Sequence, residues 1–88
     1  MRARIRDLVE ADLEAVYDWY EGCREGLGLD FIDDFISAVR VVAEAPNRWP
    51  AHMIVPGVKR YRLKRFPFAL AYRVENDHWM IYAVEDLR

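Results

Sequence analysis

The sequence predicts an α+β protein with the element order β-α-α-β-β-β, in which a helical hairpin packs on one face of a small antiparallel sheet. Apolar side chains recur at helical spacing through residues 8–45 and at strand spacing through residues 58–84. Between these halves the run PNRWPAHMIVPG holds three prolines and a glycine, a composition that continues neither pattern. Because two helices cover one face of a four-stranded sheet, we expect the other face to be open, wholly or in part.

The first predicted elements are a short strand and an amphipathic helix. Residues 2–6 alternate arginine with Ala3 and Ile5, which predicts an edge strand whose cations discourage edge-to-edge pairing. From about Leu8 the spacing becomes helical, with acids on the opposite side of the helix. We expect this helix to end between Gly22 and Gly26. Its apolar stripe consists of Val9, Leu13, Val16, Tyr17 and Tyr20.

A second helix is expected over residues 29–45. Asp30 is its predicted N-cap, and Asp33 and Asp34 in the first turn complement the positive end of the helix dipole. Pro46 ends the helix because its ring cannot continue the helical hydrogen bonds. The apolar stripe is Phe31, Phe35, Ala38, Val39 and Val42, widened by Ile32, Ile36 and Ala43.

Three strands are expected after the connector, over residues 58–66, 68–74 and 78–84. Glu75, Asn76 and Asp77 lie between the last two strands and predict a tight turn. No repeat, low-complexity stretch or flexible linker interrupts the sequence. Residues 1–88 are therefore expected to form a single domain.

Composition narrows the class of protein. The 88-residue chain has 3 Trp, 5 Tyr and 4 Phe, whose large side chains supply a core that short chains often lack. Cys23 is the only cysteine, which excludes an intrachain disulfide and suits a reducing compartment. The sequence shows neither a membrane span nor the apolar region of a signal peptide. We expect a soluble protein of the cytoplasm with no membrane partner.

Charge is strongly segregated along a chain whose net charge is −2. Residues 58–74 read VKRYRLKRFPFALAYRV and contain six basic residues and no acid. Residues 7–34 contain ten acids and one cation, Arg24. Such segregation focuses electrostatic potential on one surface and favours an anionic partner, whether RNA, DNA or an acidic protein.

The basic segment predicts a binding surface on the sheet. Strand alternation places Tyr61 and Leu63 on one side and Arg60, Arg62 and Lys64 on the other. Arginine suits this role because its planar guanidinium forms paired hydrogen bonds with phosphate or carboxylate. The alternative is that these cations only keep an exposed strand soluble and unpaired. In the next strand, alternation puts Phe68, Leu70, Tyr72 and Val74 on one face. We expect this face to pack in the core rather than to stack on the bases of a nucleic acid.

No arrangement in the sequence specifies a catalytic or metal site. RNA cleavage needs a general acid and base beside a cation. His52 and His78 are expected in the connector and at a strand start, as ordinary surface or turn residues. Glu85 and Asp86 follow the last strand, but their spacing specifies no metal site. We therefore expect no catalytic residue, metal or cofactor, and the sequence favours a binding protein while leaving enzymatic activity open.

Four segments occur in an order and spacing that match a known pattern: ADLEAVYDWYEG, GLGLDFIDDF, APNRWP and VKRYRLKRFPFALAYRVENDHWMIYAV. Their most specific pieces are Asp18-Trp19-Tyr20-Glu21, Gly26-Leu27-Gly28, and Arg65-Phe66-Pro67-Phe68 leading into Ala71-Tyr72-Arg73-Val74. Together they resemble the RelE/ParE superfamily of type II toxin–antitoxin systems, closer to its ParE-like branch. The resemblance runs from about Ile5 to Arg88.

The resemblance implies the toxin of a type II system, which stops bacterial growth when free and is neutralised by a cognate antitoxin in a hetero-oligomer. It implies a β-α-α-β-β-β fold wrapped by a largely helical antitoxin, and a role in plasmid stabilisation. ParE-like members poison DNA gyrase and RelE-like members cut mRNA on the ribosome, so gyrase is the expected target and ribosome-bound mRNA the alternative. Contacts with target or antitoxin are expected at Arg60, Arg62, Lys64, Arg65, Arg73 and Arg88.

One position departs from the family pattern. Many relatives end the last strand with Ala-Val-x-His-x-x-Arg, and here the run AVEDLR puts Asp86 in place of the histidine. Loss of that histidine argues against acid catalysis of RNA cleavage. The basic and aromatic tail of many relatives is also missing after Arg88. A third alternative is therefore a non-toxic module that keeps only the fold and the antitoxin groove.

Overall fold

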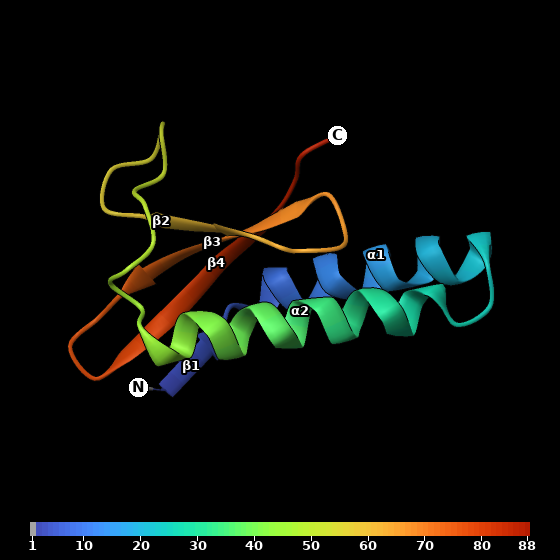
Figure 1. The fold of residues 1–88 in the computed structure, drawn as a ribbon, viewed down its shortest axis with the longest axis horizontal. Coiled ribbons are helices and arrows are strands. Elements are labelled where there is room, and N and C mark those ends of the chain that lie inside the picture. The colour runs from blue at the N-terminus through green and yellow to red at the C-terminus, as the bar shows by residue number, and fades with distance from the viewer. Residues whose placement is uncertain (1) are drawn as a thin grey trace.

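The computed structural model describes residues 2–88 and confirms the predicted order of elements (Figure 1). Strand β1 is Arg2–Ile5, helix α1 is Asp7–Cys23 and helix α2 is Leu27–Glu44, followed by strands β2 at Lys59–Arg62, β3 at Phe68–Val74 and β4 at His78–Asp86. The strands form one sheet in the order β1-β4-β3-β2. The two helices run together along one side of this sheet, as Figure 1 shows.

The sheet is mixed rather than antiparallel throughout. β2, β3 and β4 pair in antiparallel fashion as expected. β1, however, pairs parallel to β4, with Ala3 opposite Trp79 and Ile5 opposite Ile81. Parallel neighbours need a long crossover connection, and the two helices with the strands that follow supply it. β1 and β2 are thus the two edges of the sheet, and β4 lies inside it.

The core lies between the helical hairpin and the sheet, chiefly its two inner strands, β3 and β4. Val9 of α1 is 1 % exposed, and Phe31 and Val42 of α2 are both 0 % exposed. From the sheet, the fully buried side chains that face them are Leu70, Tyr72, Trp79 and Ile81. The predicted apolar stripes of both helices are confirmed apart from two residues. Ile36 is 41 % exposed, and the half-buried Tyr17 lies against Gly28 of α2 and outside the core cluster.

The turn between the helices depends on one glutamate and two glycines. α2 begins earlier than expected, and its N-cap is Gly26, with φ of 87°, so the prediction of Asp30 as N-cap is wrong. The Glu21 carboxylate accepts hydrogen bonds from the N–H groups of Gly26 and Gly28, at 2.9 and 3.0 Å, and α1 thereby caps α2. A Cβ at Gly28 would lie 2.8 Å from the Tyr17 carbonyl oxygen, so the close approach of the helices requires glycine here.

β2 ends at Arg62, well before the expected boundary at residue 66. The reason is Asp34 of α2, which is only 6 % exposed and accepts hydrogen bonds from the backbone N–H groups of Arg65 and Phe66, at 3.0 and 2.9 Å. Those N–H groups are then unavailable to a strand ladder. Phe66 instead packs against the core, with its ring centroid 4.8 Å from that of Tyr20. β4, in contrast, runs past its expected end at residue 84.

Candidate binding face of the sheet

The side of the sheet opposite the helices carries a group of arginines. In β2, Tyr61 is 8 % exposed in the core, so its neighbours Arg60 and Arg62 point to the opposite side. In β3, Tyr72 is buried in the core, and Arg73 likewise points away from the helices. We call this side the open face, and it corresponds to the uncovered face that the sequence predicts.

An arm formed by residues 50–58 runs along the start of β2. The backbone N–H of His52 donates to the carbonyl of Val58 at 2.7 Å, and that of Arg60 donates to the carbonyl of Pro50 at 3.0 Å. The segment that the sequence identifies only as an irregular connector therefore contains a short stretch of strand-like pairing. In Figure 1 the yellow-green segment rises from the end of α2 past the label of β2 and loops back into that strand.

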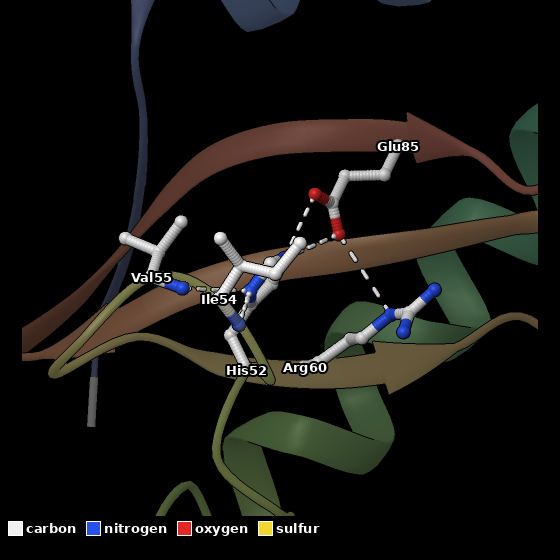
Figure 2. A network of polar contacts seen from close by, with 5 residues as sticks. All are labelled: His52, Ile54, Val55, Arg60 and Glu85. Atoms are coloured by element: carbon white, nitrogen blue, oxygen red, sulfur yellow. Dashed lines mark hydrogen bonds and ion pairs between the residues drawn. The ribbon is translucent and has the colours of Figure 1, made fainter.

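His52 fastens the arm to β4 across the open face (Figure 2). Its Nε2 lies 2.9 Å from Oε2 of Glu85, and its Nδ1 accepts the backbone N–H groups of Ile54 and Val55, both at 3.1 Å. Because two backbone donors fix Nδ1 as an acceptor, Nε2 carries the proton and donates to Glu85. Arg60 completes the group, with Nε 3.7 Å from Oε1 of the same carboxylate.

This polar group holds the arm in place. The His52 side chain is 9 % exposed, so it is a largely buried residue rather than the surface residue that the sequence suggests. Both of its ring nitrogens take part in hydrogen bonds within the protein. His78 lies in a different place, beside Asp77 at 2.7 Å, and this contact holds the pKa of the Asp77 carboxyl below its usual value. Within residues 2–88, no group of three or more His, Cys, Asp or Glu side chains is placed to hold a metal ion.

The predicted row of Arg60, Arg62 and Lys64 is broken after its second member. Lys64 lies beyond the end of β2 and lines a small depression against α2, so it does not share a face with the two arginines. Arg65 follows in the same turn, with its guanidinium 3.8 Å from the Asp30 carboxylate of α2. The prediction of three cations on one sheet face is therefore wrong, because Asp34 pulls the turn toward the helix.

Arg73 lies on the open face and contacts both Tyr82 of β4 and the arm. Its guanidinium and that of Arg6 lie over the ring of Tyr82, with their central carbons 5.6 and 5.2 Å from the ring centroid. Arg73 also donates to the carbonyl of Pro56 in the arm at 3.5 Å. Arg62, in contrast, is exposed and makes no side-chain hydrogen bond or ion pair with any of residues 2–88.

Arg88 lies apart from the other predicted contacts, in a groove beside Trp19 of α1. Its guanidinium donates to Asp86 through Nη2 at 2.8 Å and Nε at 3.0 Å, and its central carbon lies 5.7 Å from the ring centroid of Phe68. These hydrogen bonds hold the pKa of the Asp86 carboxyl at about 2. The residue that replaces the family histidine is thus an anion at neutral pH, and it has no proton to donate.

No helix of the described chain, residues 2–88, is long and apolar enough to cross a membrane.

Comparison with solved structures finds a similar chain. A chain described as "Chromosomal ParDE TA system from P. aeruginosa" superposes with a TM-score of 0.88 and 26 % sequence identity, covering 100 % of this chain and 97 % of that chain. No protein-family model and no curated protein sequence matches. The superposition spans every helix and strand, and it agrees with the ordered sequence segments that carry the resemblance. The resemblance to the RelE/ParE superfamily of toxins, closer to its ParE-like branch, is thereby confirmed, and the whole of this chain is similar to a chain of a ParDE toxin–antitoxin system.

Proposed function

We propose that this chain is the toxin of a type II toxin–antitoxin system, that it arrests bacterial growth by binding DNA gyrase, and that a cognate antitoxin neutralises it in a hetero-oligomer. The observation that carries the proposal is the whole-length similarity to a chain of a ParDE toxin–antitoxin system. The coverage of 97 % of that chain means that the comparison rests on the whole fold and not on one motif.

Two features of the polar groups support a binding mechanism over cleavage of RNA. His52 has both ring nitrogens in hydrogen bonds, one to Glu85 and the other to the backbone of the arm. Asp86, at the position of the family histidine, is held ionised by Arg88. A general acid must carry a proton that it can donate at the substrate. Asp86 is ionised at neutral pH, and the Nε2 proton of His52 is already directed at Glu85.

The open face is the surface that we assign to the target or the antitoxin. Arg60 and Arg62 lie on it side by side, and Arg62 keeps its guanidinium free of partners among residues 2–88. Arg73 lies on the same face, and we propose it as a further contact. We also propose Lys64, Arg65 and Arg88 as contacts, and these three lie outside the open face. Anionic surfaces of a partner would meet the cations of β2 first because they are concentrated on one strand.

Charge reversal on β2 tests this assignment. Arg60→Glu combined with Arg62→Glu is expected to abolish growth arrest while circular dichroism shows a folded protein. The matched control is Arg24→Glu with Arg40→Glu, which makes the same change of charge on the helical hairpin. Full toxicity of the β2 variant would remove the basic strand from the mechanism.

Pulse labelling of DNA and protein synthesis, just after this chain alone is induced in bacteria, tests the target. Failure of DNA synthesis first is the outcome expected for gyrase poisoning. Failure of protein synthesis first would instead identify ribosome-bound mRNA as the target, and analysis of the transcripts would then show cleavage. Unimpaired growth with correctly folded protein would contradict a toxin and leave the non-toxic antitoxin-binding module.

A further inference from the structure

β2 is an edge strand whose outer side is only half covered. The arm pairs with its first half, where Ala51 bridges to Lys59 and the Arg60 N–H donates to the Pro50 carbonyl. Backbone groups at alternate residues of a strand point the same way, so Arg62 turns its N–H and C=O outward as Arg60 does. These groups have no backbone partner among residues 2–88. The second half of β2 is therefore a free sheet edge.

A cavity of about 580 Å³ opens beside this free edge. Trp49, Ala51, Met53 and Tyr61 give it a largely apolar lining. Trp49 packs edge-on against Tyr61, with ring centroids 4.6 Å apart, and its indole N–H is buried without an acceptor among the described residues. Met53 is 89 % exposed at the tip of the arm, so one wall of the cavity is open to a partner. Such a site accepts an apolar side chain from outside.

Two arginines, Arg60 and Arg62, also line the cavity. Arg60 is paired within the protein, with its Nε 3.7 Å from Oε1 of Glu85. Arg62 has no such neighbour in the described chain. A guanidinium in this setting favours a carboxylate from another molecule, because charge-assisted hydrogen bonds are stronger than neutral ones.

We propose that the free edge of β2 captures an extended acidic segment of a partner protein, which adds to the sheet as a new strand beyond the arm. The segment pairs with the outward N–H and C=O of Arg62, places an apolar side chain in the Trp49–Tyr61 cavity and sets a carboxylate against the Arg62 guanidinium. This proposal rests on the proposed function, in which the antitoxin is the partner that supplies the segment.

Other occupants fit the edge less well. A second copy of this chain would bring its own free edge, and β1 carries Arg2 and Arg4, so arginines would face arginines. A nucleic acid would satisfy the guanidinium groups, but it has no strand-like ladder to pair with the free edge and no aliphatic side chain for the cavity. An acidic, partly apolar peptide uses all three features together.

The test uses the whole protein and a synthetic heptapeptide that alternates glutamate with leucine. Binding is expected to slow amide hydrogen exchange at Arg62 at least tenfold, while the Tyr61 amide, which faces β3, serves as the internal control. A heptapeptide with lysine in place of glutamate should bind at least tenfold more weakly. Unchanged exchange at Arg62 with saturating peptide would overturn the proposal, and so would protection of this amide by single-stranded RNA instead of the peptide.

Two variants separate backbone pairing from charge. Arg62→Ala keeps the outward N–H, whereas Arg62→Pro removes it at an edge position where proline is tolerated, so proline should weaken peptide binding at least tenfold more than alanine. Met53→Asp, at the exposed arm tip, adds an anion beside the cavity and should weaken binding at least tenfold even if Arg62→Pro fails to fold. Equal binding by all variants would refute the proposal. The peptide-binding test is independent of the growth test of the proposed function. If the chain arrests growth but does not bind the peptide, only the strand-capture proposal is refuted. If the chain binds the peptide but does not arrest growth, only the proposed function is refuted.

Discussion

Replacement of Asp34 by alanine tests what holds the turn at residues 64–66 against α2. One oxygen of this buried carboxylate, Oδ2, accepts the backbone N–H groups of Arg65 and Phe66 at 3.0 and 2.9 Å. Hydrogen bonds to a charged acceptor contribute about 1.5–3 kcal/mol each. Because both bonds share one oxygen, and because water can reach the turn once the side chain is removed, we expect Asp34→Ala to cost about 3–4 kcal/mol rather than the full sum.

This loss is large for so small a protein. A chain of 88 residues has an expected unfolding free energy of about 4–13 kcal/mol, so the alanine variant should be marginally stable. Asp34→Asn keeps an oxygen that can accept both N–H groups and loses only the charge, and we expect it to cost about 1–2 kcal/mol.

Urea unfolding followed by circular dichroism measures these differences, with the slope of the transition checked for constancy between variants. Asp33→Ala is the matched control, because Asp33 is an exposed acid on the same helix and should change stability by no more than about 0.5 kcal/mol. A loss below about 1 kcal/mol for Asp34→Ala, or equal losses for the two alanine variants, would refute the assignment of Asp34 as the anchor of the turn.

Two further predictions concern the helix contact and a buried tyrosine. Gly28→Ala should lower the unfolding free energy by more than about 2 kcal/mol, because the new methyl would lie 2.8 Å from an α1 carbonyl oxygen. At Gly22 a new methyl would meet nothing within 4 Å, so Gly22→Ala should raise the unfolding free energy by up to about 1 kcal/mol. Thermal unfolding measures both changes. Burial raises the pKa of Tyr72 from 10.0 to about 12, so its contribution to stability is complete below pH 10 and is lost as pH rises toward 12. Ultraviolet titration should show one late-ionising tyrosine, which Tyr72→Phe removes.

The helices were the most predictable part of the fold. Side chains such as Val9, Phe31 and Val42 recur at helical spacing, and this spacing is visible within a few residues of sequence. The strand pattern likewise identified β3 and the turn that follows it. Periodicity carries no information on which strands become neighbours, and the parallel pairing of β1 with β4 was therefore not predicted.

The misplaced parts of the candidate site all depend on contacts between distant residues. Asp34 is 31 positions from Arg65, and His52 is 33 positions from Glu85. No local pattern connects such pairs, so the sequence suggested that Lys64 continues a basic row and that His52 is an ordinary surface or turn residue. One signal was present: an acid in the middle of an apolar helical stripe, as Asp34 is, often has a buried partner.

The position of β4 inside the sheet has a consequence for when the protein can fold. Within residues 2–88, β1 pairs with β4 alone, and Arg2 lies opposite His78. The first strand to be synthesised therefore cannot pair until the last strand has been made. Contacts between such distant residues form slowly because a long loop must close first. A ribosome-bound chain can build its helical hairpin early, but it cannot complete the sheet before β4 has left the exit tunnel. On the proposed function, the toxin acquires its full binding face only after β4 has been translated, whereas its helices are available to a partner sooner.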